Sequence, residues 1–460
     1  MIEAIHTITQ AVKDKQMDLR VNADLFNIYE GELLPYVQNA LSKQLSAESY
    51  EQIKHRLAPI NLLIKLIDKL STLYSDPPTR EVKDGNDTDS AQLAWYVENY
   101  KANKVLGGAN EFANLFKNTL IQPYRDSLYR PRLRTIPSSQ FVVASSDSRD
   151  PLRMTELGVI MGQENGKLII HVYTDDSFAI VDGDGKILTD RMAAIGNDGS
   201  NPIGKIPFVY DNRSSNLIMP KVETGMLALT TLFPVLISDL NFVSMFQAFS
   251  ILYGINVSDK GLTFAPNAFW NFEQKDPELK PSIGTIKPDA DIDALISLIQ
   301  FEIVLWLNSR GVRPGAVANL NADNLVSGVS KIIDEMDTFD AVKDQQQEFT
   351  DVENDLWDLT FNYLHPYWSR DAEYENRAIF TPNATVETTF VLPAPLADRG
   401  DLIDNLKKEE DAGYTTRKRN IQRLNPRFTD KEIDALIVEI DAEKKETVII
   451  KDDPDNGSEV

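Results

Sequence analysis

Histidine is the first residue type to examine for catalytic chemistry, and its four copies lie in four separate segments: His6, His55, His171 and His365. No two of them have metal-ligand spacing, and no serine stands near one in a nucleophile-elbow setting. The chain has no cysteine, which removes thiol nucleophiles and thiolate metal ligands. The stretch GSNPIGKIPFVY contains a Gly-Lys pair but lacks the pattern of a phosphate-binding loop. We therefore expect neither a catalytic histidine nor a metal or nucleotide site.

Two carboxylate pairs are the remaining candidates for site chemistry. Asp182 and Asp184, within VDGDGKILTD, have the spacing that opens a calcium loop, but the further oxygen ligands and the closing glutamate are missing. We predict a β-turn there. Asp334 and Glu335 are adjacent on a predicted helix and do not face one another, so they make a poor acid–base pair. The sequence predicts no enzyme and no cofactor.

A long acidic helix, from about residue 325 to 365, is the strongest pattern in the chain. It would be about 60 Å long at about 1.5 Å per residue, with Pro366 ending it. Only Lys331 and Lys343 oppose the acids, which are Asp334, Glu335, Asp337, Asp340, Asp344, Glu348, Asp351, Glu353, Asp355 and Asp358. In one chain this is a solvated face. Repeated around a ring, it would create an inward field that keeps a polyanion from adhering.

The charge balance argues against tight binding of nucleic acid. The chain carries a net charge of −23, whereas proteins that neutralise phosphates are basic. Contact with DNA without adhesion stays open. A small basic cluster, Arg417–Arg419 with Arg423 and Arg427, is better explained as a solvated helix face that balances nearby acids than as a DNA contact.

The elements that would position these groups change in type along the chain. Apolar periodicity predicts helices over residues 22–37, 49–78, 91–105 and 108–129. Residues 135–210 are β-rich, with strands in QFVVAS, ELGVIMG, KLIIHVYT and KIPFVYD, and a hairpin of FAIV and KILT bridged by DGDG. We predict a small, mostly antiparallel unit.

Helix then returns, interrupted by an irregular insert. Two helices, over 217–250 and in DIDALISLIQFEIVLWLNSR, flank an insert with short strands such as ILYGINV and FWNFE. The apolar stretch 225–237 is 13 residues long and contains Pro234, so we predict a buried helix and no membrane span. The second helix is apolar nearly all round and needs neighbours. Further on, TVETTFVLP alternates as a strand, and a helical block precedes an acidic tail.

This order of segments resembles the portal, or head–tail connector, proteins of tailed bacteriophages. RLAPINLLIKLIDKLSTLYSDPP is similar to the family's early helix with its proline-bearing exit, and GKIPFVYDNRSSN to the strand and turn before the first stem helix. ISLIQFEIVLWLNSRGVRPGAVANLNADNLVSGVSKII resembles the second stem helix, the tunnel loop and the start of the tunnel helix. PAPLADRGDLIDNLKKEEDAGYTTRKRNIQRLNPRFTDKEIDALIVEI resembles the helical crown.

The resemblance implies an α+β, mainly helical fold with small antiparallel β elements and a wing, stem, clip, tunnel helix and crown. Its segments would be the following: wing 1–216, first stem helix 217–250, clip 251–289, second stem helix 290–310, tunnel loop 311–324, tunnel helix and wing return strand 325–393, crown 394–445, and disordered acidic tail 446–460.

The function that the resemblance implies is a ring, usually of twelve subunits, at one capsid vertex. Viral DNA passes through it during packaging and ejection. The implied partners are the large terminase, a neck or adaptor protein, the major capsid and scaffolding proteins, and double-stranded DNA. The implied location is the virion, with assembly in the host cytoplasm and no membrane.

The site residues fall into two groups on this reading. The channel would be lined by Arg310, Arg313, Asn319, Asn321, Asn324, Lys331, Asp334 and Glu335, and the clip would dock partners through Phe264, Phe269, Trp270 and Phe272. Replacing Arg313 should leave ring assembly intact yet change DNA packaging or retention. The alternative reading is an acidic scaffolding or adaptor protein that forms no ring.

Overall fold

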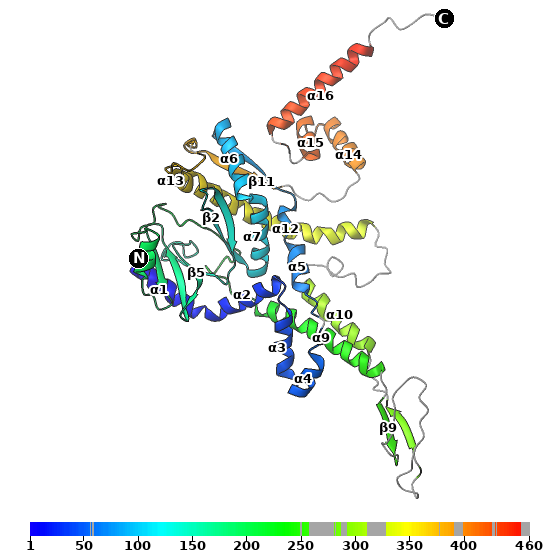
Figure 1. Ribbon diagram of the computed structural model, residues 1–460. Helices are drawn as coiled ribbons and strands as arrows, with labels where there is room; N and C mark the ends of the chain where they lie inside the picture. The colour runs from blue at the N-terminus through cyan, green and yellow to red at the C-terminus, as the bar shows by residue number, and fades with distance from the viewer. Residues whose placement is uncertain are drawn as a thin grey trace, which may run out of the picture. The chain divides into compact units, whose positions relative to one another are not determined.

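The structure is a computed structural model that describes residues 1–55, 57, 59–248, 251–256, 280, 282–286, 292–310, 328–376, 378–390, 399–425, 428 and 430–451. It is a mixed α+β fold, mainly helical, with small antiparallel sheets, as predicted (Figure 1). The chain divides into two compact units. The first comprises residues 1–27, 63–224 and 311–460, and the second comprises residues 28–62 and 225–310.

A four-stranded sheet carries one core of the first unit. Its strands are β4 (Phe141–Ala144), β5 (Glu156–Glu164), β6 (Lys167–Tyr173) and β7 (Phe178–Asp182), antiparallel in that order. Helix α1 (Ile2–Asp14) buries its apolar face on this sheet, next to the start of α2 (Gln16–Tyr29). A Cβ at Gly158 would clash with Ile8, so glycine is what allows the close approach of α1 to β5.

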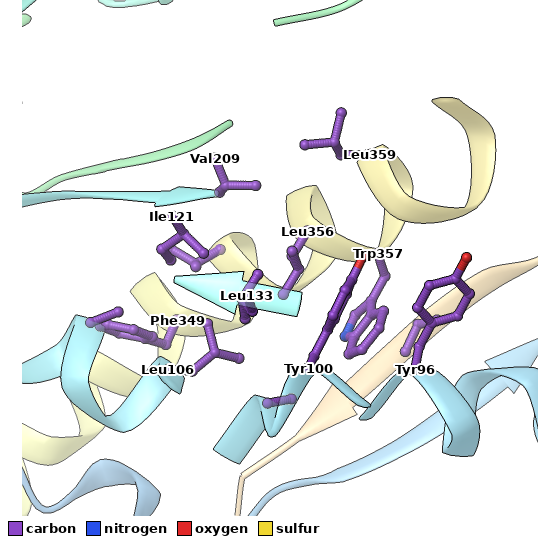
Figure 2. Packing of buried hydrophobic residues seen from close by; sticks show 14 of the residues in the cluster. Tyr96, Tyr100, Leu106, Ile121, Leu133, Val209, Phe349, Leu356, Trp357 and Leu359 are labelled. Carbon is purple, nitrogen blue, oxygen red and sulfur yellow. The ribbon is translucent and has the colours of Figure 1, made fainter. Parts of the chain in front are cut away.

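A three-stranded sheet carries the other core. Its order is β3 (Pro131–Ile136), β2 (Asn118–Arg125), β8 (Val209–Asn212), and helices α6 (Asp87–Tyr100) and α7 (Ala102–Phe116) pack on it. The Asn86 side chain caps α6 in a capping box with Asp89. Figure 2 shows the rings of Tyr100 and Trp357 lying face to face, with centroids 6.1 Å apart.

A two-stranded sheet joins distant parts of the chain. β1 (Thr79–Lys83) follows the turn η1 (Leu73–Ser75) and pairs with β11 (Thr385–Thr389), from Thr79 opposite Thr389 to Lys83 opposite Thr385. The prediction of β11 is confirmed. β1 was not predicted, because TREVK is charged and follows the two prolines that end the helical pattern.

Three predicted helices are broken in the structure, each at a residue with positive φ. The helix over 22–37 ends at Tyr29 before Gly31, and the helix over 91–105 is divided at Lys101. The helix over 108–129 ends at Phe116, and strand β2 follows after Lys117. Pro123 lies within that strand, and proline disfavours a helix interior. In place of the predicted helix over 49–78, the structure has three shorter elements: α4 (Ala47–Ile53), α5 (Leu62–Leu70) and η1.

The predicted hairpin of FAIV and KILT is also wrong in part. FAIV forms most of β7, but KILT contributes only one bridge, Val181 to Ile187, and α8 (Thr189–Ala194) follows at once.

The second unit contains two apolar helices that flank a small sheet. These are α9 (Thr224–Ala248) and α10 (Ile292–Asn308), with β9 (Ile251–Ile255) and β10 (Ser282–Ile286) paired antiparallel between them in sequence. Helix α3 (Leu34–Gln44) and α4 belong to the same unit. The prediction of two helices around a β insert is therefore confirmed. The predicted strand FWNFE lies outside the described residues, and β10 was not predicted.

The long helix is α12 (Gly328–Asp358), and it does not stop where the sequence predicted. It continues as a π-helical segment η2 (Leu359–Leu364) and then as α13 (His365–Trp368). Pro366 lies in the first turn of α13, where its missing N–H needs no partner. The chain therefore remains helical past Pro366, as far as Trp368.

The C-terminal helices are α14 (Arg399–Asp411), α15 (Arg417–Leu424) and α16 (Asp430–Lys451). Leu406 and Ile433 are buried among them. The predicted disordered tail begins too early, because α16 extends to Lys451. Residues 452–460 lie outside the described part.

Candidate functional site

The structure places the predicted site residues unevenly. Arg310 follows the end of α10, half-buried, and its backbone N–H donates to the Leu307 carbonyl at 3.0 Å. Lys331, Asp334 and Glu335 belong to the first turns of α12, but their side chains lie outside the described part of the chain. The remaining predicted site residues also lie outside it: Arg313, Asn319, Asn321, Asn324, Phe264, Phe269, Trp270 and Phe272.

One acid of the long helix is not solvated at all. Glu353 is fully buried and accepts from Arg80 through Nε at 2.8 Å and through Nη2 at 2.6 Å. The Tyr74 hydroxyl and the Trp357 indole N–H also donate to it, at 2.9 and 2.7 Å. The expectation that every acid of this helix faces solvent is therefore wrong for Glu353, which fastens α12 to β1.

The other described acids of α12 form a stripe on the opposite side. At about 100° per residue, positions 344, 348, 351, 355 and 358 fall within an arc of about 80°, away from buried Phe349, Val352 and Leu356. We call these five residues the acidic stripe. Its middle members, Asp344, Asp351 and Asp355, are exposed.

Cations of the first unit neutralise the two flanking members of the stripe. Arg213 Nε donates to Glu348 at 2.9 Å, and Lys205 Nζ donates to Asp358 at 2.8 Å. Burial, reinforced by the Glu348 carboxylate, raises the pKa of Asp211 well above its usual range, against the opposing effect of Arg213. Among the described acids of α12, the residues that present charge to solvent are therefore those at the centre of the stripe.

A polar cavity of about 560 Å³ opens beside the end of the stripe. Asp355, Lys205 and Tyr363 border it, and the Lys205 ammonium lies 4.8 Å from the centre of the Tyr363 ring. Asp355 reaches solvent at the rim, where partial desolvation raises its pKa; Lys205 opposes the shift, and the Asp358 and Asp351 carboxylates add to it. Crowded carboxylates of this kind repel further anions.

Helix α10 is the second candidate surface. Ile299, Ile303, Trp306 and Leu307 are buried, and the Trp306 ring packs against Phe233 of α9 with ring centroids 5.6 Å apart. Figure 1 shows α9 and α10 running alongside one another. On a different side of α10, Leu298, Phe301 and Leu305 are 48%, 59% and 52% exposed. The prediction of a helix that is apolar on nearly every side is confirmed, and this face has no cover within the described part of the chain.

The apolar part of helix α9 is longer than the 13 residues counted from the sequence. The segment Thr224–Asn241 of this helix has 18 residues with a mean hydropathy of 1.2, so by length and composition it could cross a membrane. In the structure, 33% of this segment is buried. The length of 13 residues is therefore an underestimate, because the helix continues through Pro234 and Asp239. The buried cores of soluble proteins pass the same test, so this finding by itself assigns no membrane.

The turn predicted at Asp182 is confirmed. The Asp182 carboxylate accepts from the backbone N–H groups of Asp184 and Lys186 at 3.0 and 2.9 Å. Lys167 Nζ forms ion pairs with the side-chain carboxylates of Asp182 and Asp184. Within the described ranges, no group of three or more His, Asp or Glu residues is arranged to hold a metal ion.

The C-terminal basic cluster is engaged with acids of its own helices. Arg417 pairs with Asp441, Lys418 pairs with Asp434 at 2.6 Å, and Arg423 pairs with Glu409 at 2.8 Å. These pairs favour the solvated helix face over a DNA contact.

Sequence reasoning missed the cations that anchor the long helix. Arg80 and Glu353 are 273 residues apart, and nothing in their local sequence links them. Comparison with known proteins adds no assignment: no protein-family model matches the chain, and no curated protein matches it.

Proposed function

We propose that this chain is a portal subunit that assembles into a ring at one capsid vertex and forms the channel through which viral DNA is packaged and ejected. The observation that carries the proposal is the uncovered apolar face of α10, made by Leu298, Phe301 and Leu305. Leaving such a face in contact with water costs about 25 cal/mol of free energy for each Å² of apolar surface. A second copy of the same chain can cover it, and heterologous contacts that close generate a ring.

The acidic stripe supports a channel rather than a DNA-binding surface. Its exposed members are all carboxylates, so a duplex passing close to them gains no counterion release and does not adhere. The Glu353–Arg80 pair at the back of the helix would hold this side in a fixed orientation. A channel surface that repels DNA would let the duplex move through without binding to it.

The element order supports the same proposal. On this proposal, helix α9, the β9–β10 sheet and helix α10 would be the stem, clip and stem, and α12 with β11 would be the tunnel helix and return strand. On this proposal the clip docks the terminase and then a neck protein, and the location is the virion. The channel loop would contribute Arg313, Asn319, Asn321 and Asn324, and the clip would contribute its aromatic residues.

Negative-stain images and light scattering of the purified full chain test the proposal. We expect closed rings with a central hole and a mass many times the 51.8 kDa of one chain. A stable monomer or dimer without a hole would instead favour the acidic adaptor. Protein that stays in solution only with detergent would point to α9 as a membrane helix. Either result defeats the ring.

A further inference from the structure

An arginine-rich hairpin stands apart from the charge of the rest of the chain. β2 and β3 are joined by a turn, and the segment Tyr124–Arg134 contains four arginines and no lysine: Arg125, Arg130, Arg132 and Arg134. The opposing carboxylates are Asp126, and Asp371 as the partner of Arg125. Four cations against two anions leave a positive surface on a chain whose net charge is −23.

The turn holds two of these arginines, Arg130 and Arg132, in a fixed arrangement. One oxygen of Asp126 accepts from the backbone N–H groups of Leu128 and Arg130, at 2.9 and 3.0 Å. The other accepts from Nε of Arg130 and of Arg132, both at 3.2 Å. Desolvation raises the pKa of Asp126. The hydrogen bonds from the two backbone N–H groups, and then the charges of the two guanidinium groups, outweigh this effect and hold the pKa below its usual value. The single carboxylate of Asp126 therefore positions the guanidinium groups of both Arg130 and Arg132, and its one negative charge balances only one of their two positive charges.

Exposed aromatic and apolar side chains lie among the arginines. Leu128 is 63% exposed and Tyr129 is 40% exposed, with Tyr129 at φ 58° at the tip of the turn. The Arg125 guanidinium lies 5.6 Å from the centre of the Tyr129 ring, and Arg134 lies 5.6 Å from that of Tyr124. Tyrosine and arginine are among the residues enriched at protein interfaces, whereas lysine is depleted there.

Two kinds of anionic partner fit an arginine surface, and the composition favours protein over nucleic acid. A duplex would meet an excess of only two positive charges here and repulsion from the rest of the chain. An acidic protein surface needs fewer charges and also uses Leu128 and Tyr129. A second copy of this chain, with 70 acidic residues against 47 basic ones, is such a surface.

We propose that the hairpin Tyr124–Arg134 docks on an acidic surface of a second copy of this chain. The contact rests on the proposed ring, in which every subunit has neighbouring copies. It differs from the apolar contact of α10 because it is charged, and salt therefore weakens it. Arg130 and Arg134, whose side chains reach solvent, make the new ion pairs, while Leu128 and Tyr129 fill the space between them.

Photo-cross-linking of the full chain tests this contact directly. p-Benzoylphenylalanine replaces Leu128, the assembled protein is irradiated, and the adducts are mapped by mass spectrometry. We expect adducts between copies, at a segment rich in Asp and Glu. The same probe at Met161, which is 49% exposed on β5, is the control for chance contacts.

Charge reversal supplies the second measurement. The double variant Arg130→Glu with Arg134→Glu should lose these adducts and weaken association on the order of tenfold or more. The variant Arg20→Glu, which reverses an exposed arginine on α2, should not. Adducts that persist unchanged in the double variant would overturn the proposal.

The remaining outcomes separate this proposal from the proposed function. Rings without adducts between copies overturn the docking surface and leave the ring intact. Adducts between copies without rings support the docking surface and defeat the portal assignment. Fluorescence anisotropy with a short DNA duplex tests whether the hairpin binds nucleic acid instead. If the wild type binds the duplex, the double variant does not, and no adducts form between copies, then the hairpin is a phosphate-binding site and the proposal is overturned.

Discussion

Arg80 and Glu353 form a buried, two-pronged ion pair between β1 and the long helix α12. Their side chains are 5% and 0% exposed, and the guanidinium reaches both carboxylate oxygens. Tyr74 and Trp357 donate to the same carboxylate, so each of its oxygens accepts two hydrogen bonds. Burial and the adjacent Glu353 carboxylate raise the pKa of Tyr74, which keeps its hydroxyl a donor.

Removing one partner of this pair should destabilise the first unit. Arg80→Met leaves the buried Glu353 carboxylate uncompensated, at an expected cost of about 3–5 kcal/mol. Urea unfolding followed by tryptophan fluorescence measures the loss, because Trp357 touches the carboxylate. The double variant Arg80→Met with Glu353→Leu should recover much of the loss. A single variant as stable as the wild type would show that the pair is not a significant anchor.

Much of the fold follows from local patterns. The strands in ELGVIMG and KLIIHVYT were predicted because their apolar residues are β-branched or alternate, and because turn residues bound them. The apolar character of α10 was equally visible. In such segments, propensity and burial favour the same structure.

What the sequence could not show depends on contacts between distant residues. NTLIQPYR gave no strand signal, because it forms β2 only by pairing with β3 and with β8 some 90 residues later. Likewise, Glu353 was counted with the solvated acids because its charge is matched by Arg80, far away in the chain. The arginine hairpin was overlooked because its first half had been assigned to a helix ending at Tyr129, while Arg130, Arg132 and Arg134 fell outside every predicted element.

A histidine of the four-stranded sheet should make stability depend on pH. Desolvation, with help from Arg191 and Arg134, lowers the pKa of His171 in β6 to about 4. A lowered pKa means that the folded state binds this proton less readily than the unfolded state, whose histidine has a pKa of about 6.5. His171 therefore contributes stability above about pH 6.5 that is lost as the pH falls towards about 4.

The His171→Gln variant measures that contribution. Between pH 7.5 and pH 5, the free energy of unfolding of the wild type should fall by more than that of the variant. Urea titrations at several pH values give both slopes, and other titrating groups cancel because both proteins contain them. Parallel slopes would show that His171 does not titrate differently on unfolding.

The acidic stripe should reduce the affinity of the assembled ring for DNA. Neutralising its exposed centre, with Asp344→Asn, Asp351→Asn and Asp355→Asn together, should make a short duplex bind more tightly, most clearly at low salt. Anisotropy titrations across a salt series measure this change. In packaging assays, the same variant should slow DNA passage.

A matched variant controls for net charge. Replacing exposed Glu30, Glu32 and Glu48 by Gln changes the charge of the chain by the same three units, at positions of the second unit and not of α12. This control should leave DNA affinity nearly unchanged. If both variants bind the duplex equally well, the effect comes from overall charge and the stripe has no special role.

The uncovered face of α10 should decide whether the chain assembles. In a ring, Phe301 is covered by the next copy, so Phe301→Glu places a charge in an apolar contact, where an unpaired charge is strongly unfavourable. We expect the variant to appear as a 51.8 kDa monomer in light scattering. Asn308→Glu, an exposed position at the end of the same helix, is the matched control and should still assemble.

Folding of the variant can be checked independently of assembly. Phe301 is exposed, whereas Trp306 and Phe233 are buried against each other, so tryptophan fluorescence and helical circular dichroism should match those of the wild type. A folded monomer with Phe301→Glu, next to rings with Asn308→Glu, places a subunit contact on this face. Rings that form equally well with Phe301→Glu would mean that the exposed side of α10 serves another purpose, and that copies of the chain associate elsewhere.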